Sequence, residues 1–132
     1  MSAVAKGSFT VDMKPQVEPA SVDGVSLGRM SLRKRFDGDL QAISVGEMLT
    51  ALTPVKGSAG YVAIERVTGT LHGRTGSFVF QHSGTVNQGA QQLSITVVPG
   101  SGTGALSGIS GTFTISIVEG KHLYEFTYAL PE

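Results

Sequence analysis

Cysteine and tryptophan are both absent from this chain of 132 residues. The lack of cysteine excludes disulfides, thiolate metal sites and thiol nucleophiles together. No run approaches the roughly 18 apolar residues of a membrane-spanning helix. The first residues carry no apolar stretch of signal-peptide length, so we expect a cytoplasmic protein without a membrane partner. An excess of one charge is also missing, because ten basic residues balance ten acidic ones. We therefore expect no nucleic-acid partner, since such proteins carry a basic surface.

Glycine, by contrast, is abundant, with 18 residues, and 40% of the chain is hydrophobic. The length predicts a single domain over residues 1–132, with enough apolar side chains for a packed core. Apolar and polar side chains alternate with a period of two almost throughout, as Phe9, Val11 and Met13 do in one segment. Turn dipeptides such as Asp37-Gly38, which favours a type I′ turn, and Glu119-Gly120 separate these segments. The sequence therefore predicts an all-β protein.

The predicted strands are long and mostly joined by short connections, which favours an up-and-down antiparallel meander. Such a meander removes its exposed edges by closing, so we predict an eight-stranded antiparallel closed barrel rather than a sandwich. A barrel of eight strands is either filled by side chains or holds one small ligand. Residues 19–26 are expected to form a loop, and residues 100–111 a connection with one helical turn. The expected strands cover 7–17, 28–36, 40–52, 60–71, 75–86 and 121–130, with two more around 93–97 and 113–117.

Four sequence runs resemble those of a bacterial family of small proteins of unknown function. They are KGSAGYVAIERVTGT at 56–70, GSFVFQHSG at 76–84, GTGALSGISGT at 102–112 and KHLYEFTY at 121–128. The resemblance covers nearly the whole chain, and the family's fold is similar to the calycin-like barrel of plant allene oxide cyclases. It implies an eight-stranded barrel that forms a homo-oligomer, a dimer or trimer, and implies no activity. Allene oxide cyclases use an acidic residue on the first strand; here that strand offers only Asp12, opposite its apolar face, so no catalytic role is carried over.

Glu47 and Glu65 are the first candidates for chemistry, because each alternates with apolar residues on its own predicted strand. If those faces point inward, burial should raise the pKa of the carboxyl group unless a donor satisfies it. Such a group could act as a general acid or base, or bind the polar end of a ligand. The alternative is a structural acid paired with Arg66, Arg74 or a tyrosine hydroxyl, or an exposed residue.

His82 follows Phe78 and Phe80 at a period of two, so it shares their predicted aromatic surroundings. An inward imidazole near a carboxylate would form an acid–base pair, and the alternative is a hydrogen-bonded core histidine. His72 and His122 border turns, and we expect them to be solvated. The metal-ligating side chains are too few and too scattered to predict a metal site, and no cofactor-binding pattern is present.

Aromatic side chains supply the remaining candidate ligand contacts, namely Tyr61, Phe80, Tyr124 and Tyr128. Their alternative role is ordinary core packing, although a buried tyrosine hydroxyl still needs a partner.

Three functions follow from a closed barrel. It could bind a small apolar or amphipathic ligand in its lumen, act as a cyclase or isomerase on a lipid-like substrate, or be a filled structural barrel without a ligand. A lumen cavity of about 300 Å³ or more with a polar end would favour binding.

Overall fold

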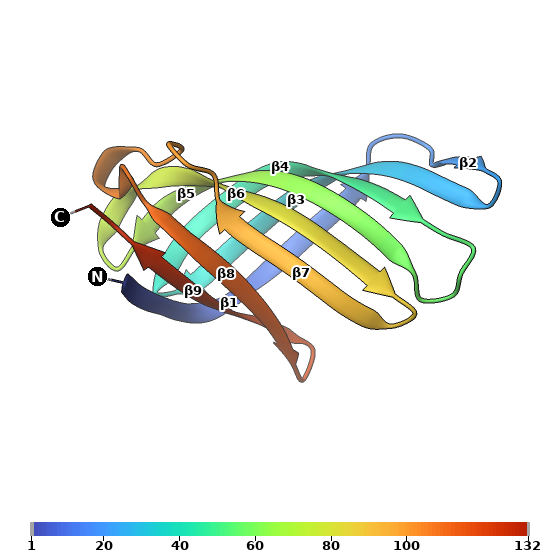
Figure 1. Cartoon of the computed structure of the whole chain (residues 1–132). Helices are drawn as coiled ribbons and strands as arrows, with labels where there is room; N and C mark the ends of the chain where they lie inside the picture. The colour runs from blue at the N-terminus through green and yellow to red at the C-terminus, as the bar shows by residue number, and fades with distance from the viewer. Residues whose placement is uncertain (1, 132) are drawn as a thin grey trace.

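The protein folds as one continuous antiparallel sheet that closes on itself (Figure 1). This computed structural model describes residues 2–131. From β2 to β9 each strand lies beside the next one in the chain, and β1 pairs with both β9 and β3, which closes the sheet. The predicted all-β, eight-stranded closed barrel is confirmed. Its strands are β1 Ser2–Pro15, β3 Val25–Gly38, β4 Leu40–Leu52, β5 Ala59–Leu71, β6 Arg74–Asn87, β7 Ala90–Val97, β8 Ser110–Val118 and β9 Lys121–Ala129, with a short additional strand, β2 Ala20–Val22.

The tight turns that join the strands use glycine at positions where the backbone angle φ is positive. Two consecutive residues with positive φ match the twist of a hairpin, and glycine adopts positive φ without strain. The predicted type I′ turn at Asp37-Gly38 is wrong in detail, because only Gly38 has a positive φ, 102°, and β4 starts after Asp39. The predicted loop at 19–26 also needs correction, since it contains β2. Four turns have positive φ at both positions: Asp23-Gly24, His72-Gly73, Gln88-Gly89 and Glu119-Gly120.

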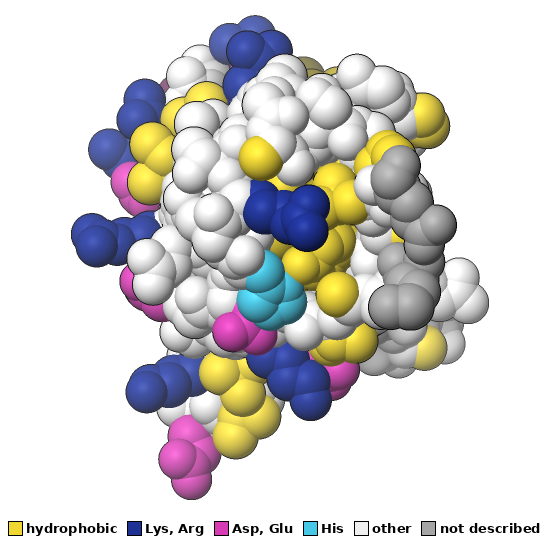
Figure 2. All heavy atoms as spheres, turned by 90° about the vertical axis from the view of Figure 1, so that its left-hand side faces the viewer, with side chains coloured by type: hydrophobic (Ala, Val, Ile, Leu, Met, Phe, Trp, Pro, Cys, Tyr) yellow, Lys and Arg dark blue, Asp and Glu magenta, His cyan; other side chains and the backbone are white. Residues whose placement is uncertain are grey.

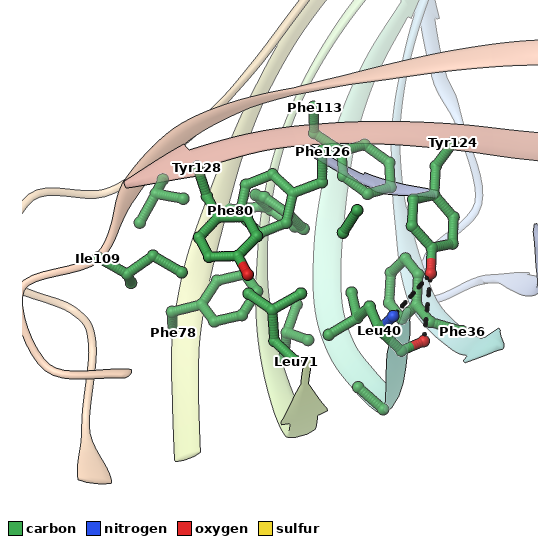
Figure 3. Packing of buried hydrophobic residues seen from close by; sticks show 14 of the residues in the cluster. Phe36, Leu40, Leu71, Phe78, Phe80, Ile109, Phe113, Tyr124, Phe126 and Tyr128 are labelled. Atoms are coloured by element: carbon green, nitrogen blue, oxygen red, sulfur yellow. Dashed lines mark hydrogen bonds between the residues drawn. The ribbon is translucent and has the colours of Figure 1, made fainter. Parts of the chain in front are cut away.

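Aromatic side chains fill one half of the barrel (Figure 3). The ring centroids of Phe80 and Phe113 are 4.8 Å apart, and those of Phe78 and Phe126 are 5.6 Å apart. A single 3-10 turn, η1 Gly104–Leu106, lies in the predicted connection between β7 and β8 and buries Leu106. Together with buried Ile109, it plugs this end of the lumen. The hydrophobic core is therefore displaced toward the plugged end.

A small cluster of polar side chains lies on the outer surface at the plugged end of the barrel (Figure 2). His72, in the turn between β5 and β6, is exposed as expected, and its ring Nδ1 hydrogen-bonds the hydroxyl of Tyr128. Its Nε2 lies 3.5 Å from Asp39 Oδ2.

His122 differs from the expectation, because it is half-buried with its ring 5.1 Å from that of Phe9. In residues 2–131 no helix has the length and apolar character needed to cross a membrane.

Candidate functional site

The opposite end of the barrel is open and contains a trough of about 310 Å³. Inward-facing residues of β4, β5, β6 and β7 form its walls, where these strands extend beyond the filled half. The surface is mostly apolar, with polar groups from Thr50, Tyr61 and Gln91. The lumen therefore has two halves, one packed with aromatic rings and one accessible from outside. The principal apolar wall residues are Met48, Leu52, Ala59, Val86 and Leu93.

A cluster of four buried polar side chains lies between the two halves. Lys34 Nζ donates a hydrogen bond to Glu65 Oε1 over 3.0 Å. His82 Nε2 lies 2.6 Å from the same oxygen, and Ser44 Oγ donates to Glu65 Oε2 over 2.6 Å. Glu65 itself is completely buried. Four neighbouring strands, β3 to β6, thus each contribute one side chain to the cluster.

The strand register explains how these side chains meet. Glu65 pairs with Gly46 of β4 and with Phe80 of β6, so Ser44 and His82 are the next inward-facing residues beside it. Gly46 has no side chain, and this lets the two strands approach closely. A Cβ atom at this position would lie 2.2 Å from the Ile64 carbonyl oxygen and 2.8 Å from the Glu65 Cβ. The glycine therefore leaves room for the carboxylate inside the barrel.

Glu65 is ionised in these surroundings. Burial by itself would raise the pKa of its carboxyl group, because a charged group loses solvation. The hydrogen bond from His82, the positive charge of Lys34, the electrostatic attraction of His82 and the Ser44 hydroxyl outweigh that effect, and together they hold the pKa at about 2 against an ordinary 4.5. The exception stated from the sequence therefore applies: donors satisfy the buried carboxylate, and its pKa is not raised. Glu65 accepts hydrogen bonds at neutral pH and does not act as a proton donor.

Lys34 is buried with its charge satisfied on two sides. Its ammonium group contacts the Glu65 carboxylate and lies 5.0 Å from the centroid of the Phe9 ring and 5.9 Å from that of Phe36. Aromatic faces attract cations, and the lysine stem covers apolar surface. Lys34 therefore connects the charged cluster to the aromatic half of the barrel.

Tyr61 connects the cluster to the trough. Its half-buried side chain forms part of the trough wall, and its ring centroid lies 6.4 Å from that of His82. Burial, with the nearby Glu65 charge, raises the pKa of the Tyr61 phenol, so its hydroxyl stays protonated at neutral pH. Tyr61, Glu65 and His82 were predicted together from the sequence, and the structure places them together.

The other predicted site residues lie elsewhere. Glu47 faces outward and pairs with Arg29, with 3.1 Å between Oε1 and Nε, so its predicted place in the lumen is wrong. Phe80, Tyr124 and Tyr128 point inward but belong to the filled half, away from the trough. Their aromatic rings therefore form core rather than the wall of the open cavity.

Lys34 and Ser44 were not predicted as members of the site. The partner of Glu65 is Lys34, and neither Arg66, Arg74 nor a tyrosine hydroxyl takes that place. One sequence signal was available, because Lys34 alternates with Met30, Leu32 and Phe36 on the apolar face of its strand. A lysine in that pattern indicates a buried cation that needs an acidic partner. Ser44 gave no comparable signal.

Metal-ligating side chains do not gather in groups of three or more anywhere in residues 2–131. Asp12, the acid of the first strand, is exposed and lies 3.9 Å from the Lys14 ammonium group. Among residues 2–131, the buried polar and charged side chains are the four of the cluster around Glu65.

Comparison with known proteins agrees with the whole architecture. Among solved structures, the chain is similar to a protein of unknown function from Shewanella oneidensis MR-1, a member of the DUF3224 family. The two share 50% sequence identity, and the match covers 100% of both chains with a TM-score of 0.94. No curated protein matches the sequence. Residues 5–128 match a family described as "Protein of unknown function (DUF3224)". The chain belongs to the DUF3224 family.

Proposed function

We propose that this protein binds a small amphipathic molecule in the open half of its barrel. The apolar body of the ligand lies in the trough among Met48, Leu52 and Leu93, and its polar head points inward toward Tyr61 and His82. A site of this kind joins an apolar wall with a few well-placed polar groups, which is the usual composition of small-molecule sites. The volume of about 310 Å³ suits a molecule of roughly ten to twenty heavy atoms.

The observation that carries this proposal is the position of the Glu65 cluster. Buried charges cost free energy even when paired, and an apolar filling of similar volume is often as stable or more stable. Here the charges lie where packing ends and open space begins, and the rest of the filled half is apolar. A purely structural barrel has no need for a charged group at that boundary, whereas a ligand with a polar head does.

The proposal is tested by blocking the trough. Ala59→Phe places a ring among the wall residues, whereas Ala90→Phe makes the same change at an exposed residue of β7 outside the trough. With 1-anilinonaphthalene-8-sulfonate as the fluorescent probe, we expect Ala59→Phe to weaken binding at least tenfold and Ala90→Phe to leave it within twofold. Circular dichroism checks that both variants fold.

Native mass spectrometry of gently purified protein gives a second measurement. A bound small molecule that is lost from Ala59→Phe and retained by Ala90→Phe supports the proposal. If no molecule co-purifies and the probe binds neither wild type nor variants, the barrel is a filled structural one with no ligand.

A cyclase or isomerase acting on a lipid-like substrate, as in allene oxide cyclases, is the second candidate function. The observation that favours it is the pair of Glu65 and His82 in direct contact beneath the trough. In this reading the barrel holds a reactive substrate in one conformation while charged groups guide the rearrangement. Because Glu65 is ionised and fully occupied by its three donors, its role would be to orient and stabilise its partners.

A further inference from the structure

Glu65 determines which ring nitrogen of His82 carries a proton. An ionised carboxylate only accepts hydrogen bonds, so the short contact of 2.6 Å requires His82 Nε2 to be the donor. In a neutral imidazole one nitrogen is protonated and the other has a free lone pair. Glu65 therefore fixes the tautomer in which Nδ1 of His82 is unprotonated.

The second ring nitrogen of His82, Nδ1, lies outside the contact with Glu65. It makes no hydrogen bond within residues 2–131, yet every sealed side-chain nitrogen or oxygen in that part of the chain has a partner. Nδ1 therefore keeps some accessible surface, although only 3% of the His82 side chain is exposed. His82 lies one inward-facing position deeper on β6 than Gly84, a residue of the trough wall, and the Tyr61 ring packs over Gly84: a Cβ there would lie 2.4 Å from Tyr61 Cε1.

We propose that His82 Nδ1 is the base of the lumen, which takes a hydrogen bond or a proton from an O–H or acidic C–H at the head of the bound molecule. This inference rests on the proposed binding function and deepens it, because it names the ligand class. The ligand has an apolar body and ends in a hydroxyl group or in a carbonyl with an acidic C–H beside it. Glu65 is a positioning residue that acts through His82.

The charges around His82 are consistent with this chemistry. Glu65 and Tyr61 of β5 and Lys34 of β3 are the titratable groups that face the ring, and Ser44 of β4 is uncharged. The negative charge of Glu65 and the positive charge of Lys34 cancel. A proton transferred from the ligand to His82 leaves its electron pair behind on the ligand as an anion, which balances the charge of the imidazolium.

The complete step needs no further reagent. The ligand's O–H or C–H bond breaks, and its electron pair stays on the oxygen or is delocalised into the adjacent carbonyl. The proton forms a new N–H bond at Nδ1, and the imidazolium is stabilised by the Glu65 carboxylate. Return of the proton to the same atom gives simple exchange, and return to a different atom gives isomerisation. Nothing is oxidised or reduced.

The ligand-free protein provides the first test. Nitrogen-15 NMR of the histidine rings distinguishes the two neutral tautomers, because protonated and unprotonated ring nitrogens resonate far apart. At pH 8 we expect His82 to carry its proton on Nε2, with Nδ1 unprotonated. A proton on Nδ1 of the neutral ring overturns the inference, whatever the protein binds.

A matched pair of probes provides the second test. 2-Naphthol has a donor hydroxyl, and 2-methoxynaphthalene has the same rings without one. Both are fluorescent, and the chain has no tryptophan to interfere. Because the methoxy group cannot donate the hydrogen bond that the hydroxyl donates, we expect wild type to bind 2-naphthol about five- to tenfold more tightly. His82→Gln keeps an amide donor near the position of Nε2 for Glu65 and loses the acceptor at Nδ1, so it should bind both probes equally.

The outcomes separate the two levels of the proposal. Equal affinities in wild type, or a preference for 2-naphthol that persists in His82→Gln, overturn the role of His82 and leave the binding function standing. Failure of both probes to bind wild type overturns the binding function and with it any contact between His82 and a ligand. If circular dichroism shows that His82→Gln is fully folded and the variant still prefers 2-naphthol, the conclusion is the same as for equal affinities in wild type: His82 does not have the proposed role.

Discussion

The hydroxyl group of Tyr124 contacts both backbone polar groups of Leu40, 84 residues earlier in the chain (Figure 3). It accepts a hydrogen bond from the Leu40 N–H over 2.9 Å and lies 3.3 Å from the Leu40 carbonyl oxygen. It also lies 2.9 Å from the Asp37 carbonyl oxygen. One side chain of β9 therefore hydrogen-bonds the backbone at the β3–β4 connection, including the buried N–H of Leu40.

Tyr124→Phe should consequently lower the free energy of unfolding by about 1–3 kcal/mol, because it leaves the buried Leu40 N–H unpaired. Tyr128→Phe is the matched control, since its hydroxyl hydrogen-bonds the exposed His72 side chain and water can replace it. Urea unfolding followed by circular dichroism measures both changes. Equal losses in the two variants would show that the Tyr124 hydroxyl has no special place in the closure of the barrel.

Lys34→Met should be strongly destabilising, by about 3–5 kcal/mol, because it leaves the buried Glu65 carboxylate without its cation. Methionine keeps much of the lysine stem, so packing against Phe9 and Phe36 changes little. Glu65→Gln keeps a polar amide beside Ser44 and His82, but it leaves the buried Lys34 ammonium group without its carboxylate, so it should also be destabilising.

The double variant Lys34→Met with Glu65→Gln isolates the interaction. Since it removes both charges together, it should be more stable than the sum of the single losses predicts. Urea unfolding of the four proteins completes the cycle. Strict additivity would mean that the two buried charges do not stabilise one another.

The barrel and part of the site could be predicted from the sequence, because both depend on a local period of two. Glu65 alternates with Tyr61, Ala63 and Val67, and this pattern indicated its inward face correctly. Glu47 failed the same reasoning, because its strand has apolar residues on both faces. In such a strand the alternation gives two faces but does not say which one is inside.

The contacts within the site could not be predicted, because they depend on the register between strands. Lys34 and Glu65 are 31 residues apart and meet only through the pairing of β3, β4 and β5. The division of the lumen into a filled and an open half has a similar origin. Phe80 and Tyr61 both point inward, and only their height along the barrel decides that one is core and the other is trough wall.

Gly46→Ala should destabilise the protein by about 1–3 kcal/mol, because the new Cβ would overlap the Ile64 carbonyl oxygen and crowd Glu65. The control is Gly60→Ala on the neighbouring strand, where the nearest atom to a Cβ is 3.8 Å away. That variant should change stability by less than about 0.5 kcal/mol. Thermal and urea unfolding compare the two. Similar stabilities would show that the close approach of β4 to Glu65 is not required for folding.

Acid should destabilise the protein through Glu65. Its pKa lies at about 2 in the folded protein against an ordinary 4.5, so the folded state favours the ionised form. A depressed pKa of this kind stabilises the fold fully above about pH 5, and that stabilisation disappears as the pH falls toward 2. The difference between the two values corresponds to roughly 3 kcal/mol.

Glu65→Gln isolates this contribution, because other groups also respond to acid. Asp39, for example, has its pKa lowered by the hydrogen bond from the Lys6 backbone N–H, and it titrates in both proteins. We therefore expect the free energy of unfolding of wild type to fall between pH 5 and pH 2 by roughly 3 kcal/mol more than that of Glu65→Gln. Urea unfolding at intervals of half a pH unit measures the difference. Parallel curves for the two proteins would mean that Glu65 is not held ionised by Lys34, Ser44 and His82, and would remove the basis for the fixed His82 tautomer.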